Sequence, residues 1–200
     1  MARRSKPRAS SGAAARANQV RIIAGRWRGR RLPVPDVPGL RPTPDRIRET
    51  LFNWLAPRLN GANCLDLFAG SGALGFEALS RGAGSVTLVD SHAGVVRQLQ
   101  ASAELLGAQN LQVQCADALT FLNAPPRRFE VVFLDPPFRQ GLLEPVLQRL
   151  HDGGWLADDA DVYIEVEREA GCPALPPDWS VYRQGQAGQV AFFLLRNTVN

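Results

Sequence analysis

Hydrophobic and polar positions follow a repeating order from residue 63 onward. Short apolar runs end near Phe68, Val89, Ala116 and Leu134. Each run is followed by a segment of roughly 10 to 18 residues whose apolar positions are compatible with a helix. Strands that alternate with helices in this way predict a parallel sheet with helices on both faces.

The two ends of the chain follow other patterns. The stretch "VYIEVE" at 162–167 predicts a fifth strand, and residues 179–196 predict a closing antiparallel hairpin that turns at Gly185 to Gly188. Near the start, two short strands are expected around 20–24 and 30–34, joined by a turn between two glycines.

A helix is expected after this first hairpin. Thr43 is suited to cap it, with Pro44 at its first position. Apolar residues then recur with a spacing of four and predict one buried face: Ile47, Leu51, Leu55 and Leu59.

Composition indicates one domain with a small appendage, because the chain has 200 residues and 45% of them are hydrophobic. No apolar run approaches the roughly 20 residues of a membrane span. Cys64, Cys115 and Cys172 lie far apart, which favours neither a metal cluster nor a disulfide framework and indicates a reducing cytoplasm.

Charge is segregated along the sequence. Residues 1–58 hold 14 Arg and Lys against 3 acids, whereas residues 59–200 hold 9 against 16. Genome composition could explain the preference for Arg over Lys, but it does not explain this separation, which suggests two partners of opposite charge. Residues 1–19 contain no acid and predict a disordered basic arm. They also have the composition of an organelle transit peptide, but they lack the Leu, Ile, Phe or Trp of an amphipathic face.

Acidic residues stand at or near the ends of four predicted strands. Asp66 lies inside the first of them, whereas Asp90, Asp117 and Asp135 end the next three. The carboxyl ends of parallel strands meet at one edge of a sheet, where ligands bind. Asp90 and Asp117 could each simply cap the helix that follows. Four acids gathered at one rim repel one another, and a cationic or hydrogen-bond-donating ligand would relieve that repulsion.

The loop after the first strand of the sheet matches G-x-G-x-x-G over Gly70 to Gly75, with Asp90 about 20 residues on. This pattern alone also fits NAD. A pyrophosphate would lie close to Asp66 without an obvious counter-ion, whereas S-adenosylmethionine presents a sulfonium and an ammonium. Asp66 suits that cation, Asp90 can accept from two ribose hydroxyls, and Asp117 can accept from the adenine amine. A methyl donor is therefore favoured over a hydride carrier.

The stretch "VVFLDPPF" ends in Asp135, Pro136, Pro137 and Phe138. It resembles the (Asn/Asp)-Pro-Pro-(aromatic) motif of methyltransferases that modify planar amino nitrogens. A carboxylate and a proline-fixed carbonyl can accept the two N–H bonds of such an amine, while the aromatic ring stacks on the base. Rate would then come from positioning and charge stabilisation, without a metal. The alternative is a rigid turn with a buried Phe.

Five segments together resemble one known family over roughly residues 20–196: "RIIAGRWRGRRLPVP", "GLRPTPDRIRETLFNWL", "LDLFAGSGALGFEALSRGA", "VFLDPPF" and "AGQVAFFLLR". The family is RsmD, bacterial enzymes that methylate guanine N2 at position 966 of 16S ribosomal RNA. The resemblance implies a class I S-adenosylmethionine-dependent methyltransferase fold, which is Rossmann-like. It has a mostly parallel seven-stranded sheet with helices on both faces, preceded by a small N-terminal β-hairpin. The basic arm at 1–19 matches nothing in the family. The resemblance implies an RNA-binding hairpin at 20–40 and the methyltransferase domain at 41–200.

The resemblance also implies the site residues. Asp135 to Phe138 would hold the amine. Related sequences often carry Glu at the position of Asp90, and the Asp side chain is shorter but keeps the negative charge. The residues implied to contact the cofactor are Arg41, Thr43, Asp66, Phe68, Ala69, Gly70, Ser71, Gly72, Asp90, Asp117 and Ala118.

With that resemblance the first hairpin acquires a role in binding RNA. Arginines neutralise phosphates, and an aromatic ring can stack on an unpaired base. An ordinary solvated charged face is the alternative. The residues expected to contact RNA are Arg21, Arg26, Trp27, Arg28, Arg30 and Arg31.

The sequence therefore predicts a cytoplasmic, monomeric rRNA guanine-N2 methyltransferase. Its substrate would be 16S rRNA within the small ribosomal subunit, with or without ribosomal proteins, and the target guanine would leave its stack. Asp-Pro-Pro-Phe alone does not choose the base, so an adenine-N6 methyltransferase is the nearest rival. The rivals of other classes are an NAD(P) oxidoreductase and a non-catalytic RNA-binding assembly factor.

Overall fold

The computed structural model describes residues 19–37 and 42–197. The arm expected at 1–19 lies outside these ranges except for Gln19, which begins the first strand. The elements are β1 Gln19–Arg21, β2 Arg31–Pro33, α2 Asp45–Leu59, β3 Asn63–Asp66, α3 Ala73–Ser80, β4 Ser85–Asp90, α4 Ala93–Leu106, β5 Leu111–Cys115, α5 Ala118–Phe121, β6 Phe129–Leu134, α6 Leu143–Asp152, β7 Leu156–Glu167, β8 Trp179–Ala187 and β9 Val190–Asn197.

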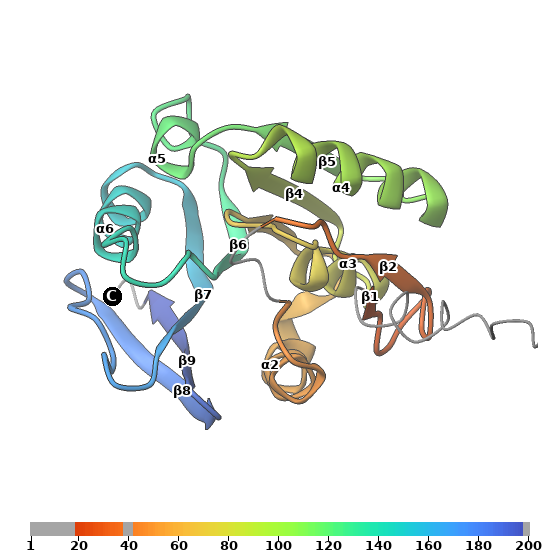
Figure 1. The fold of residues 1–200 in the computed structure, drawn as a ribbon. Coiled ribbons are helices and arrows are strands. Elements are labelled where there is room, and N and C mark those ends of the chain that lie inside the picture. The colour runs from red at the N-terminus through yellow and green to blue at the C-terminus, as the bar shows by residue number, and fades with distance from the viewer. Residues whose placement is uncertain (1–18, 38–41, 198–200) are drawn as a thin grey trace, which may run out of the picture.

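Seven strands form one sheet in the order β5-β4-β3-β6-β7-β9-β8, and β1 pairs with β2 in a separate antiparallel hairpin. β3 to β7 are mutually parallel, and β9 runs antiparallel to both of its neighbours. The hairpin, α2, α3 and α4 cover one face and α5 and α6 cover the other (Figure 1). The predicted parallel sheet with helices on both faces and an N-terminal hairpin is confirmed.

The strand before Asp135 is buried on both faces, which explains its unbroken apolar run. Val131 and Phe133 pack into the core beneath α2 and α3. Val132 and Leu134 pack into the core beneath α6 on the opposite face. A polar residue can therefore follow this strand only where it leaves the sheet.

The buried carboxylate of Glu77 on α3 fastens the hairpin to the sheet domain. It accepts hydrogen bonds from the backbone N–H groups of Ile23 at 2.7 Å and Ala24 at 3.0 Å. Two arginines neutralise it, Arg81 at 2.7 Å and the wholly buried Arg48 at 3.5 Å. A charge in this position is tolerated because every side of it meets a donor.

The start of α2 differs from the prediction. The buried face is as expected, because Ile47, Leu51 and Leu55 are fully buried. The helix begins at Asp45, however, and Pro44 at the N-cap position makes no side-chain cap bond. Thr43 is buried and its hydroxyl bonds to acids of the sheet, so its expected capping role is wrong.

The last hairpin also differs in one detail. Gly185, expected in the turn, lies within β8 opposite Phe192. A Cβ atom at this position would lie 2.4 Å from Cζ of Phe192, so the glycine makes room for that ring. The turn itself falls at Gly188, between β8 and β9.

Among the described residues, no helix combines the length and apolarity needed to cross a membrane. Within the same ranges, no three His, Cys, Asp or Glu side chains are grouped so as to hold a metal ion.

We expect Glu77→Gln to lower the free energy of unfolding by about 3 kcal/mol, because it removes the charge that Arg81 and the buried Arg48 share and leaves Arg48 with Asp45 as its one remaining ion pair in the described residues. Chemical denaturation of the full chain measures this. Glu49→Gln, at an exposed position of the neighbouring helix α2, is the matched control and should change it by less than about 0.5 kcal/mol. Equal stability of the two variants would contradict the role given to Glu77.

Candidate active site

The glycine loop connects β3 to α3 at the carboxyl edge of the sheet. Gly70 and Gly72 have φ values of 50° and 74°, a region that favours glycine. Gly75 lies against β4, and a Cβ atom there would be 2.2 Å from Cδ2 of Leu88. These glycines hold the start of α3 close to the sheet, beside the end of β3.

Asp66 is the last residue of β3 and is 2% exposed. Its Oδ2 accepts the backbone N–H of Gly75 at 3.0 Å. Burial, with smaller contributions from the charges of Asp90 and Glu165, raises the pKa of Asp66 to about 7. The free energy of unfolding that depends on this group therefore falls as pH rises from about 4 to about 7, because the folded state holds the proton more tightly.

Asp90 ends β4 and also organises the glycine loop. Its Oδ2 accepts the N–H of Gly70 at 3.0 Å and its Oδ1 accepts that of His92 at 2.8 Å. Each carboxylate oxygen has a second lone pair, so Asp90 keeps the capacity to accept further hydrogen bonds.

Asp117 caps α5, as one of the two readings of the sequence proposed. Its Oδ1 accepts the N–H groups of Leu119 at 3.0 Å and Thr120 at 3.2 Å. The residue is exposed and follows β5, next to β4, while Ala118 behind it is buried. Asp117 therefore lies at the same edge as Asp90, with one carboxylate oxygen outside the cap.

Asp135 follows β6 and lies in a cluster of three acids. Burial, and next the charges of Glu165 and Asp66, hold the pKa of Asp135 well above its usual range. Glu165 lies on the adjacent strand β7, one residue beyond the paired Leu134 and Ile164. Among residues 19–37 and 42–197, no arginine or lysine forms an ion pair with any of the three.

Asp135 and Glu165 of this cluster are hydrogen-bonded to hydroxyl groups and, in the described part of the chain, are not paired with cations. The hydroxyl of Thr43 bonds to both Asp135 and Glu165. The hydroxyl of Tyr163 donates to Oε1 of Glu165 at 3.0 Å, and burial raises the pKa of Tyr163 well above its ordinary value. Burial likewise raises the pKa of Glu165, against the lowering effect of these bonds. The cluster is hydrogen-bonded but electrostatically uncompensated.

The sequence did not single out Glu165 and Tyr163 as site residues. The available signal was an acid within the otherwise apolar strand "VYIEVE", at a position where Glu165 is only 3% exposed. A carboxyl group buried in a central strand requires a partner.

The turn after Asp135 exposes an aromatic ring. Pro136 is buried and Pro137 is exposed, and the side chain of Phe138 is 40% exposed. Arg139 has a φ of 63° and pairs with Glu167 at the end of β7, with an N–O distance of 2.9 Å. Phe138 thus lies in a turn that is tied to β7, with part of its ring open to solvent.

The acids at this edge fit the cofactor expected from the sequence. The buried Asp66 and Glu165 and the half-buried Asp135 have no cation beside them among the described residues, and the neighbouring glycine loop permits close backbone approach, so the site fits a ligand with a positive charge near Asp66. They do not fit a pyrophosphate at that place. Arg41, also expected to contact the cofactor, lies outside the described residues.

The hairpin residues expected to bind RNA divide into two groups. Arg26, Arg28, Arg30 and Arg31 are exposed, as is Arg21, which pairs with Asp45. Trp27 is only 6% exposed, and its backbone N–H donates to Oγ of Ser80 at 3.0 Å. Its expected stacking on an unpaired base is therefore wrong, because the hairpin lies on α3 and turns this ring into the core.

Comparisons with known proteins agree with one another. The family model described as "Conserved hypothetical protein 95" matches residues 20–196. Ribosomal RNA small subunit methyltransferase D of Escherichia coli K12 is 55% identical over 88% of this chain and 89% of its own length. The protein of the same name from Haemophilus influenzae is 44% identical over 90% of this chain and 94% of its own.

The fold comparison leads to the same family. A solved structure titled as a putative methyltransferase from Escherichia coli superposes with a TM-score of 0.85. The two sequences are 50% identical, and the match covers 91% of this chain and 99% of that one. The fold is thus the class I methyltransferase fold that the sequence predicted. The chain belongs to the RsmD family, that of ribosomal RNA small subunit methyltransferase D.

Proposed function

We propose that this chain transfers a methyl group from S-adenosylmethionine to the exocyclic N2 of guanine 966 in 16S ribosomal RNA. The observation that carries the proposal is the joining of Asp66 and Asp135 in one buried acidic cluster, followed by the exposed ring of Phe138. Asp66 then faces the positive charge of the methyl donor, while Asp135 accepts a hydrogen bond from the amine of the base. The family resemblance supports guanine N2 over adenine N6.

Different residues of the carboxyl edge bind different parts of the cofactor. S-adenosylmethionine supplies a methyl group bound to a positively charged sulfur. When the methyl group is transferred, the sulfur keeps the electron pair of the broken C–S bond and becomes a neutral thioether. Asp66, with Thr43 beside it, would attract the cationic end of the ligand. Asp90 would accept from the ribose hydroxyls, and Asp117 would accept from the adenine amine. Backbone groups of the glycine loop would line the site between them.

The amine site is formed by the turn after β6. The Asp135 carboxylate and a backbone carbonyl of the proline turn accept the two N–H bonds of N2, which directs its lone pair at the methyl carbon. Phe138 stacks on the base and holds this alignment. As the N–C bond forms, the nitrogen loses a proton, and Asp135 is the acceptor in contact with it. A cation bound beside Asp66 lowers the pKa of Asp135 and so prepares it for that step.

The partner in this proposal is rRNA of the small ribosomal subunit, bound by the chain as a monomer in the cytoplasm. The small-subunit rRNA methyltransferases at 55% and 44% identity support that substrate. Ribosomal proteins that shape the target before methylation are a further part of the proposal.

We expect Asp135→Asn to lower methyl transfer by roughly 10²- to 10⁴-fold, because the amine loses its proton acceptor. Transfer of labelled methyl to purified small subunits and to naked 16S rRNA measures this, with the modified nucleoside identified by mass. Binding of S-adenosylmethionine should stay close to that of the unchanged chain. Asp152→Asn, at an exposed acid of α6, is the control and should be as active as the wild type. Full activity of Asp135→Asn, or methylated adenine as product, would refute the assignment.

We expect the affinity for S-adenosylmethionine to rise by about eightfold between pH 6 and 7.5, because Asp66, with a pKa of about 7, becomes ionised over that interval. Calorimetry in two buffers of different ionisation enthalpy measures both the affinity and the proton released. Asp66→Asn should bind weakly and with no such pH dependence. Affinity that is flat or falls with pH in the wild type would show that Asp66 does not face the cation.

We expect replacement of Arg26, Arg28 and Arg30 by Ala to weaken binding to 16S rRNA by roughly 10- to 100-fold at about 150 mM salt and to flatten its salt dependence. Filter binding over a salt series measures this. Replacement of Arg149, Arg168 and Arg183, which are equally exposed, is the matched control. The cofactor affinity of both variants should stay unchanged, and its loss in the hairpin variant would show a structural defect instead.

A further inference from the structure

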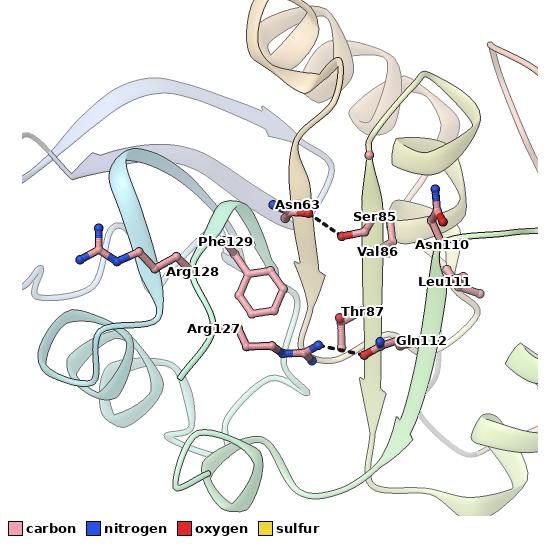
Figure 2. Close-up of a pocket in the computed structure, with 11 residues that line it drawn as sticks. Asn63, Ser85, Val86, Thr87, Asn110, Leu111, Gln112, Arg127, Arg128 and Phe129 are labelled. Carbon is pink, nitrogen blue, oxygen red and sulfur yellow. Dashed lines mark hydrogen bonds between the residues drawn. The ribbon is translucent and has the colours of Figure 1, made fainter. Parts of the chain in front are cut away.

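A polar pocket of about 630 Å³ lies at the opposite edge of the sheet from the acids. It is lined by the first residues of four neighbouring strands, Asn63 of β3, Ser85 of β4, Leu111 of β5 and Phe129 of β6 (Figure 2). The carboxyl edge lies about 20 Å away along the six residues of β4. This pocket therefore has no part in the site described above.

The chemistry of the pocket favours an anion. Its lining contains two arginines, Arg127 and Arg128, and no acid. Figure 2 shows the guanidinium of Arg127 beside Thr87, with Nη1 donating to Oε1 of Gln112 at 3.0 Å. A guanidinium has five N–H donors, so most of those on Arg127 are available. Thr87 is only 4% exposed and lines the pocket, where its hydroxyl can donate to an anion.

The second arginine is held only weakly. Arg128 pairs with Asp158 at 3.3 Å, and the two side chains are 67% and 86% exposed. Exposed pairs of this kind contribute little, so a phosphate can displace the acid. Amide and hydroxyl groups such as those of Asn63, Ser85 and Gln112 are the usual neutral partners of phosphate and ribose oxygens.

The pocket lies on the same end of the molecule as the tip of the first hairpin. The backbone N–H of Arg26 donates to the carbonyl of Ser80 at 2.7 Å, and Gly84 lines the pocket. Four Cα–Cα steps join Ser80 to Gly84 and span at most about 14 Å. The tip of the hairpin and the pocket therefore lie at the same edge of the sheet.

We propose that this amino-edge pocket, centred on Arg127, Arg128 and Thr87, binds the phosphate–ribose backbone of the substrate RNA at a point remote from the methylated base. The inference rests on the proposed function for the identity of the RNA. Because the pocket and the acidic rim lie at opposite edges of the sheet, an RNA reaches both only if it extends along the sheet. A short RNA that covers only the acidic rim does not reach the pocket.

The test compares Arg127→Gln/Arg128→Gln with the control pair Arg168→Gln/Arg183→Gln, which removes the same charge from the end of β7 and from β8. The RNAs are protein-free 16S rRNA and a short stem-loop that carries only the target guanine. For the full rRNA we expect about tenfold weaker binding by the pocket variant, with a salt slope less steep by about 1.5. The short RNA should bind both variants alike, and their thermal unfolding should match.

Four results would overturn the inference. The first three are wild-type binding of full rRNA by the pocket variant, an equal loss in the control pair, and an equal loss on the short RNA. A loss seen only with protein-containing subunits would assign the pocket to a ribosomal protein and would also refute it. If the wild type neither binds S-adenosylmethionine nor methylates subunits, the proposed function fails. The RNA-binding comparison still decides the role of the pocket.

Discussion

The removal of three carboxyl groups from water, with no cation beside them in the described ranges, is the constraint on which the site depends. Asp66, Asp135 and Glu165 are brought together by the parallel order β3, β6, β7, and the described residues supply no cation to pair with them. Hydroxyl and backbone donors stabilise each acid separately, but they do not remove the charge. Burial raises the pKa values of all three groups, and the charges of neighbouring acids add to this at Asp66 and Asp135, so the free protein holds protons that a cationic ligand would displace. The negative charge of the acids therefore complements the positive charge of the ligand.

The same helix connects this constraint to the hairpin. α3 begins at the glycine loop, where Gly75 bonds to Asp66, and its last turns carry Glu77 and Ser80, which hold the hairpin. The hairpin is therefore fixed against the element that positions the cofactor loop, although its own residues are distant in sequence. Its arginines are held on a rigid base, which lowers the entropic cost of presenting them to a polyanion.

Patterns of burial and topology were predictable from the sequence, because they depend on periodicity. The apolar run before Asp135, the helix face of Ile47 and Leu51, and the acids at strand ends each follow from local order and the rule for parallel strands. The errors concern side chains whose partners are distant in sequence. Thr43 bonds to acids on β6 and β7 instead of its own helix, and Trp27 packs beneath its own hairpin. These partners lie far away in the sequence, so the local pattern of residues around Thr43 or Trp27 does not reveal them.

The carboxyl edge of the sheet carries the acidic cluster, whereas the pocket at the amino edge is lined by arginines and no acid, and the α/β topology contributes to this difference. Helices run back against the strands, so their N-termini meet the acidic carboxyl edge, and Asp117 caps α5 there. Their C-termini meet the amino edge, where Arg30 donates to the carbonyl of Leu105 at the end of α4. Under the proposed function, RNA phosphates are repelled by the first edge and attracted to the second. A neutral base is then the part of the nucleic acid that can enter the acidic rim, so the charge pattern itself favours a nucleotide turned out of its stack.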